Sequence, residues 1–104
     1  MPNVDIEPHA ELKGVYWAEL EDGSKRLATL NLDLSRSIYG ERLVRAHKEE
    51  YRVWDAYRSK LAAAILKGIK LVPIYPGARV LYLGSASGTT ASHVSDIVAE
   101  DGAV

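Results

Sequence analysis

A run of small residues behind a short apolar segment is the stretch of this sequence best suited to chemistry. Val80, Leu81 and Leu83 form an apolar run that is typical of a buried parallel strand. Residues 84–90, which follow, carry little side-chain bulk and end in two threonines. Backbone N–H groups of such a loop can contact a ligand directly, and a helix N-terminus behind it favours anionic or polar ligand atoms. The pattern predicts a cofactor site at the carboxyl end of a strand.

The spacing of the glycines narrows the class of cofactor. Gly84 and Gly88 are separated by three residues, and Ala86 stands where a dinucleotide fingerprint has its middle glycine. No lysine follows Gly88, so the P-loop pattern is not met either. Without a phosphate motif, an uncharged or cationic nucleoside cofactor such as S-adenosylmethionine is favoured. A plain strand-to-helix turn made of small residues remains the alternative.

Other residue types with chemical potential point to structure instead. His9, His47 and His93 lie far apart in a chain without cysteine, so we predict no metal site. We interpret His93 as a surface residue beside a helical apolar stripe. Trp17 and Trp54 are expected to fill the core of a small sheet.

The elements that must position the loop begin with short strands. Residues 3–7, 14–20 and 26–32 alternate or are rich in β-branched and aromatic side chains, and Asp22-Gly23 predicts a hairpin turn between the last two. Residues 43–45 and 50–54 read as further strands, with residues 35–42 as a loop. Residues 1–54 are therefore predicted to form a small antiparallel β domain.

The pattern changes to helical at Asp55. That residue is a good N-cap, and the side chains at 57, 61, 64 and 65 share one helix face, so we predict a helix of roughly three turns that ends at Gly68. A second stripe, at residues 91, 94, 97 and 98, predicts a helix that ends at Asp101-Gly102, and Ala103-Val104 would begin a strand. The predicted fold class is α/β, with residues 55–104 as the opening βα unit of a Rossmann-like domain. Because that unit cannot close a sheet, we expect the chain to be truncated.

Composition limits the remaining possibilities. The chain has 104 residues, 47% of them hydrophobic, and a formal net charge of −1. It contains no apolar run near the ~18 residues of a membrane span and no signal-peptide pattern. We expect an intracellular protein that binds RNA or DNA weakly by itself, since polynucleotide binders usually carry a basic excess.

Two long segments resemble the fibrillarin family. One runs from Val80 to Val98 and includes the small-residue loop, and the other joins Tyr51-Arg52-Val53-Trp54 to the segment from Tyr57 to Ile65. Tyr39-Gly40-Glu41-Arg42 is also similar to the family's N-terminal domain, and the N-terminus resembles that of archaeal members. Asp55-Ala56 departs from the family's usual Asn-Pro, a modest change in helix initiation. The resemblance covers most of residues 14–104.

The resemblance implies an S-adenosylmethionine-dependent enzyme that methylates ribose 2′-hydroxyls of ribosomal and transfer RNA. Such enzymes are cytoplasmic in archaea and work in box C/D guide ribonucleoproteins, with a guide RNA, a Nop-domain scaffold protein and a kink-turn-binding ribosomal-type protein. Lys60 matches the first member of the family's Lys-Asp-Lys-His catalytic set, whose other members fall beyond Val104. The implied cofactor-binding residues are Gly84, Ala86, Ser87, Gly88, Thr89 and Thr90.

Two other functions are weighed against this one. The chain could be a non-catalytic interaction module that docks on the scaffold protein, and the residues after Val104 would discriminate between the two. A nicotinamide-dependent oxidoreductase is disfavoured by Ala86 and by the Arg58-Ser59-Lys60 helix. We expect the 104-residue chain to be inactive by itself.

Overall fold

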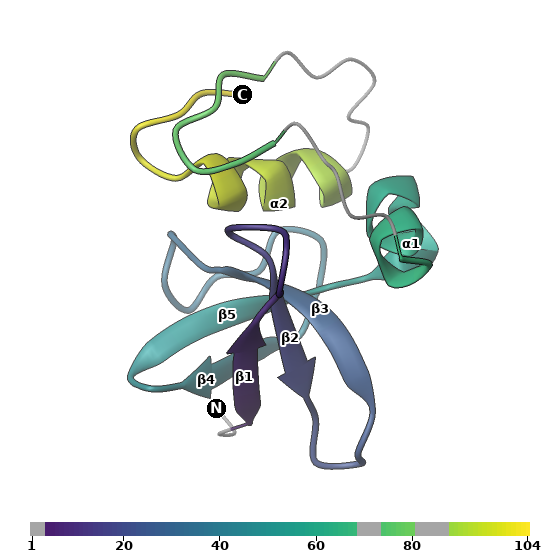
Figure 1. Ribbon diagram of the computed structural model, residues 1–104. Coiled ribbons are helices and arrows are strands. Elements are labelled where there is room, and N and C mark those ends of the chain that lie inside the picture. The colour runs from purple at the N-terminus through teal and green to yellow at the C-terminus, as the bar shows by residue number, and fades with distance from the viewer. Residues whose placement is uncertain (1–3, 69–73, 81–87) are drawn as a thin grey trace.

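An antiparallel sheet forms the N-terminal half of the molecule. The computed structural model describes residues 4–68, 74–80 and 88–104. The sheet has five strands in the order β1-β2-β3-β5-β4, and every neighbouring pair is antiparallel (Figure 1). The strands are β1 (Asp5–Pro8), β2 (Tyr16–Glu19), β3 (Lys25–Leu30), β4 (Leu43–Ala46) and β5 (Glu49–Trp54). The strands expected from the alternating pattern are confirmed.

Two tight turns set the register of the sheet. Gly23 in the β2–β3 turn has a φ of 85°, and Asp22 accepts hydrogen bonds from the backbone and hydroxyl of Ser24, which confirms the Asp-Gly hairpin. The β4–β5 turn consists of His47 and Lys48, which also have positive φ, 52° and 68°. No local pattern predicts this second turn, because neither histidine nor lysine is a residue that such turns prefer.

The expected helix after Asp55 is divided. Asp55 accepts a hydrogen bond from the N–H of Tyr57 and caps only a 3₁₀ turn, Ala56–Arg58. Ser59 then has extended backbone angles and caps a separate helix, α1 (Lys60–Leu66), and Gly68 follows with a φ of 100°. The prediction of one three-turn helix was wrong. The prediction that Tyr57 lies on the apolar face of that helix was also wrong, since its side chain is 99% exposed. The break arises because a serine that caps a helix cannot itself be helical.

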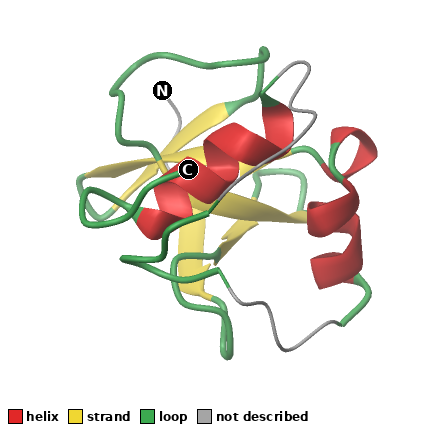
Figure 2. Ribbon diagram, turned by 90° about the horizontal axis from the view of Figure 1, so that it is seen from above, coloured by secondary structure: helices red, strands yellow, loops and turns green. Residues whose placement is uncertain are grey.

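The second helix covers one face of the sheet. Helix α2 (Thr89–Val98) lies across the strands, and α1 lies beside it (Figures 1 and 2). Val94, Ile97 and Val98 are buried, as the stripe predicted. After α2 the chain returns beside residues 78–80: Arg79 and Ala103 form a parallel bridge, and the N–H of Val80 donates to Ala103 at 2.6 Å. The proposed strand residues 81–83 lie outside the described residues.

The two faces of the sheet contact different cores. Alternate residues of β3 and β5, including Ala28, Tyr51 and Val53, pack with β1, β2 and β4. On the opposite face Leu27 and Trp54, which are cross-strand partners, pack against both helices. Trp54 is 1% exposed, as expected for a core residue, whereas Trp17 is only partly buried and stacks on His9.

The described residues meet the requirements neither of a membrane-spanning helix nor of a metal site. None of their helices is long and apolar enough to cross a membrane. No cluster of three or more His, Asp or Glu among them is arranged to hold a metal ion.

Candidate functional site

The proposed site residues that the structure describes gather at two helix N-termini. Lys60 is the first residue of α1, and its side chain is exposed. Gly88 is the N-cap of α2, and Thr89 and Thr90 are the first residues of that helix. The proposed cofactor residues Gly84, Ala86 and Ser87 lie outside the described residues.

A buried hydroxyl joins the two helix N-termini. Thr90 Oγ1 donates to Ser59 Oγ at 2.6 Å across 31 residues of sequence. The same Ser59 oxygen accepts the backbone N–H of Ala62 at 3.2 Å, which caps α1. Ser59 is 4% exposed. Since Lys60 follows Ser59 directly, this contact brings the lysine's backbone beside the turn that starts α2.

The turn at Gly88 needs a glycine. Its φ of 77° lies in the left-handed region, and a Cβ there would stand 3.6 Å from Ile38 Cγ2. The loop that contains Ile38 therefore borders the start of α2. Because Gly88 has no side chain, it supplies no side-chain cap to α2, and the positive end of the helix dipole lies at this turn.

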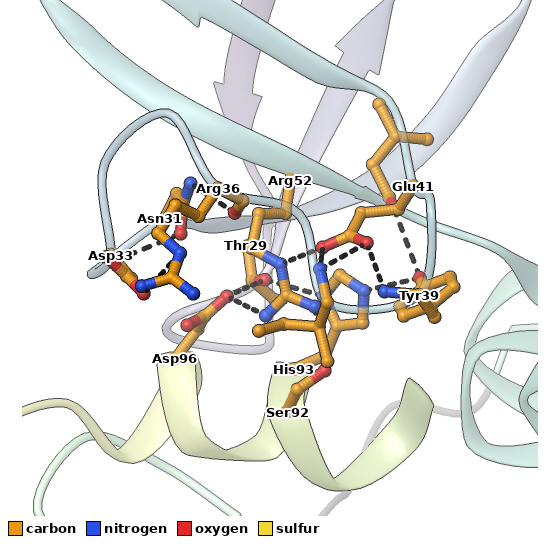
Figure 3. Close-up of polar contacts among 12 residues, drawn as sticks. Thr29, Asn31, Asp33, Arg36, Tyr39, Glu41, Arg52, Ser92, His93 and Asp96 are labelled. Atoms are coloured by element: carbon orange, nitrogen blue, oxygen red, sulfur yellow. Dashed lines mark hydrogen bonds and ion pairs between the residues drawn. The ribbon is translucent and has the colours of Figure 1, made fainter. Parts of the chain in front are cut away.

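A buried polar network fastens α2 to the sheet (Figure 3). Arg52 of β5 is 2% exposed, and its guanidinium donates to three side chains from two directions. Nε donates to Glu41 at 2.5 Å, Nη1 to Asp96 Oδ2 at 2.9 Å and Nη2 to Ser92 Oγ at 2.7 Å. Ser92 in turn donates to the carbonyl of Thr89 in the first turn of α2. The network thus extends from the sheet to the proposed cofactor residues.

His93 is the centre of the second half of this network, and its prediction as a surface residue was wrong. The side chain is 0% exposed and stacks on Trp54, with ring centroids 5.0 Å apart. Nδ1 lies 2.7 Å from Thr29 Oγ1, and Nε2 lies 2.6 Å from the hydroxyl of Tyr39 (Figure 3). The prediction that it lies beside the apolar stripe was correct, but the strands that cover this helix face are distant in sequence, since Thr29 of β3 lies 64 residues before His93.

The hydrogen bonds of the network determine the tautomer of His93. Asp96 Oδ2 accepts from Arg52, which can only donate, so Thr29 uses its one proton to donate to the same oxygen at 2.7 Å. Thr29 Oγ1 must therefore accept from His93 Nδ1–H. Nε2 of the neutral ring then accepts the proton of the Tyr39 hydroxyl at 2.6 Å, a shorter contact than the 3.3 Å from the same hydroxyl to the Val53 carbonyl oxygen. The result is a directed series of hydrogen bonds from Tyr39 through His93 and Thr29 to Asp96.

Burial shifts the pKa values of these groups in a consistent way. Burial, aided by the Arg52 charge, lowers the pKa of His93 to about 2, and burial raises the pKa of Tyr39 to about 12. Burial also raises the pKa of Asp96, although Thr29 and Arg52 oppose this shift. For Glu41 burial is outweighed by hydrogen bonds from the N–H groups of Tyr39 and Ile38 and from Arg52, which leave its pKa below the ordinary value. Arg52 is thus the cation that offsets two buried carboxyl groups.

The neutral state of His93 predicts how stability depends on pH. Below the ordinary pKa of 6.5 the unfolded chain binds a proton at this ring and the folded chain does not. The stabilisation is therefore complete above pH 6.5 and decreases as the pH falls towards 2, by about 1.4 kcal/mol per unit. Urea unfolding at pH 7.5 and 5.0 should register a loss of about 2 kcal/mol from this residue, and His93→Gln should have a shallower pH dependence. The exposed His47, changed to Gln, serves as the control and should keep the original slope.

Chemically, the two helix N-termini combine one cation with polar backbone groups. The N-terminus of α2 favours anionic or polar ligand atoms, and small residues at the turn allow close approach. The exposed ammonium of Lys60 can stabilise negative charge that develops on a reacting oxygen. The sequence did not indicate Arg52, Thr29 or Asp96, because each stands at a position that an isolated strand or helix leaves in solvent.

Known proteins similar to this chain extend over nearly all of it. The sequence model of the fibrillarin family matches residues 6–104. A fibrillarin-like rRNA/tRNA 2′-O-methyltransferase of Pyrobaculum aerophilum is 57% identical over 101 residues, which are 97% of this chain and 43% of that protein. The protein of the same name from Thermococcus onnurineus is 62% identical over 99 residues, 95% of this chain and 43% of its own length. The chain therefore spans less than half the length of these relatives.

Solved structures agree in fold over the same region. Aeropyrum pernix fibrillarin, crystallised with natively bound S-adenosyl-L-methionine, superposes with a TM-score of 0.92 at 56% identity, covering 98% of this chain and 45% of that one. Methanococcus jannaschii fibrillarin, described as a pre-rRNA processing protein, superposes with a TM-score of 0.83 at 41% identity, covering 98% and 43%. From the family match and the level of identity together, this chain belongs to the fibrillarin family.

Proposed function

We propose that this chain forms one side of the active site of an S-adenosylmethionine-dependent enzyme that methylates ribose 2′-hydroxyls in ribosomal and transfer RNA. The single observation that carries the proposal is the hydrogen bond between Ser59 and Thr90, because it places the helix of Lys60 against the turn assigned to the cofactor. The names of the relatives, which are rRNA/tRNA 2′-O-methyltransferases, support the same reaction.

The residues at the start of α2 fit a nucleoside cofactor. Gly88 adopts a positive φ that keeps the turn tight, and no side chain occupies the N-cap position of the helix. Gly88, Thr89 and Thr90, together with Gly84, Ala86 and Ser87, would hold the polar parts of S-adenosylmethionine. When bound, that cofactor supplies a methyl group on a sulfonium, an activated electrophile for a hydroxyl oxygen. The fastening of α2 through Arg52 and Ser92 keeps this turn in place relative to the sheet.

Lys60 provides the positive charge in this proposal. Ribose oxygen becomes more negative as its proton leaves, and a nearby ammonium stabilises that charge in the transition state. The side chain is exposed, and the described part of the chain gives it no ion pair, so its charge is available to a substrate. Alignment of oxygen, methyl carbon and sulfur would supply the remainder of the rate enhancement.

The net charge of the chain is compatible with work in a ribonucleoprotein. At −1 it supplies little general attraction for RNA, so the selection and binding of the substrate would fall to partners. We assign these partners as a box C/D guide RNA, a Nop-domain scaffold protein and a kink-turn-binding protein, in the cytoplasm of an archaeon. The alternative is that the chain serves only to dock on the scaffold.

Removal of the charge at Lys60 tests the enzymatic assignment. In the full-length protein, assembled with guide RNA and its partners, Lys60→Met should lower the methyl-transfer rate at least tenfold, about 1.4 kcal/mol in activation free energy. Single-turnover transfer of labelled methyl to a guided RNA gives the rate. Lys67→Met, at the other end of α1, is the matched control and should change the rate less than about twofold. A loss below tenfold in Lys60→Met would contradict the catalytic role and favour the docking alternative.

A further inference from the structure

We propose that Ser59 is a positioning residue, whose hydroxyl holds Lys60 at a fixed place relative to the cofactor turn. The inference rests on the proposed function, since it concerns the same site. Neither the motifs in the sequence nor the similarity to known methyltransferases assigns a function to Ser59.

The geometry around Ser59 differs from that of an ordinary helix cap. An N-cap serine normally accepts one backbone N–H from its own helix. Here the oxygen also accepts the hydroxyl proton of Thr90, which belongs to the first turn of another helix. The residue is 4% exposed, so neither contact competes freely with water. One atom therefore fixes the starts of both helices relative to each other.

Besides the backbone bond from the Ala63 N–H to the Ser59 carbonyl at 3.1 Å, the Ser59 hydroxyl is the polar contact that defines the start of α1 and hence the position of Lys60. The helix has 7 residues, and its first turn carries no acidic side chain. Ala62 and Ile65, its buried residues, pack into the core. Their packing fixes the direction of the helix axis but not the residue at which the helix begins. The residue before Lys60 is extended, with φ −146° and ψ 115°, so the chain direction changes at Ser59.

Small errors in this position should be costly for the reaction. In enzymes that act by aligning the reacting groups, misplacement of one group by about 1 Å can lower the rate by a factor of about 100. Loss of the Ser59 hydroxyl would remove the cap and the link to Thr90 together, and would let Lys60 move relative to the cofactor. The expected signature is a lower kcat with a smaller change in KM for S-adenosylmethionine, because none of the proposed cofactor-binding residues is substituted.

Epistasis with Lys60 is the test that separates positioning from mere support of the fold. In the full-length assembled enzyme, Ser59→Ala should lower kcat about tenfold and alter KM for the cofactor less than about threefold. Ser59→Thr retains an Oγ atom and should recover kcat to within about threefold. In a Lys60→Met background, Ser59→Ala should change the residual rate by less than about twofold, because the group it positions is already absent. Ser95→Ala, on the exposed side of α2, is the control and should leave kcat unchanged.

The outcomes distinguish this inference from the proposal on which it rests. If Lys60→Met is strongly impaired but Ser59→Ala lowers the rate by the same factor in both backgrounds, Ser59 acts on the fold or the cofactor turn, and the inference is overturned. Failure of Ser59→Thr to recover kcat while its melting temperature equals that of the unaltered protein would also overturn it. If Lys60→Met keeps its rate, the proposed catalytic role fails first, which is a different result.

Discussion

Arg52→Met is expected to lower the free energy of unfolding by about 3–5 kcal/mol. The substitution keeps most of the apolar stem and removes the guanidinium, so Glu41 and Asp96 remain buried without their cation. Glu41 retains the N–H groups of Ile38 and Tyr39, but within the described part of the chain Asp96 keeps only the hydrogen bond from Thr29. The loss of a partner from a buried charge network is costly because the remaining charges cannot regain water.

Arg42→Met is the matched control for this experiment. Arg42 also pairs with a glutamate, Glu21, but the two side chains are 39% and 62% exposed. Water and salt screen that pair, so its loss should cost at most about 1 kcal/mol. Urea unfolding of both variants, followed by circular dichroism, measures the difference. Equal effects of the two substitutions would mean that the Arg52 network does not stabilise the fold in the way described.

The contrast between these arginines also explains what the sequence can predict. The alternation in residues 14–32 located β2, β3 and their turn because it depends only on neighbours along the chain. Arg52 and Thr29 are cross-strand partners on the face that α2 covers, and by pattern alone they are polar positions that face solvent. Their burial depends on Asp96 and His93, more than 40 residues later. No local pattern carries such information.

In the candidate site, too, local sequence predicts some features, and contacts between distant residues determine the others. Lys60, Gly88 and the two threonines could be singled out from motif and helix position. Ser59 could have been found as a second N-cap, since serine before a helical run is a standard start signal. Ser59 was not predicted as an N-cap because Asp55, four residues earlier, already had that role. The alanines after Ser59 then favoured one continuous helix. The contact of Ser59 with Thr90 depends on how two helices pack, which propensity does not determine.

Gly102→Ala is expected to destabilise the protein by about 3 kcal/mol, at the upper end of the range for overpacking. A Cβ at this position would overlap the carbonyl oxygen of Ala78 and lie 2.5 Å from Val98 Cβ and 2.8 Å from the Val98 carbonyl oxygen. Both carbonyls already accept hydrogen bonds, from Ala103 and from Gly77, that tie the end of α2 to residues 77–80. Because two of the three obstacles are backbone atoms, no side-chain rotation relieves the overlap. As these two hydrogen bonds weaken, the parallel bridge between Arg79 and Ala103 should weaken as well.

Gly77→Ala separates this steric effect from backbone strain. Gly77 has a φ of 88°, so alanine there is strained by about 1–2 kcal/mol, but a Cβ would meet nothing within 4 Å. Gly102 is not among the glycines with positive φ, so its substitution tests overlap alone. Unfolding by urea should therefore rank Gly102→Ala as the more damaging change, even though it lacks the φ penalty. A smaller loss in Gly102→Ala than in Gly77→Ala would show that the end of α2 is not packed against residues 77–80 as closely as these distances require.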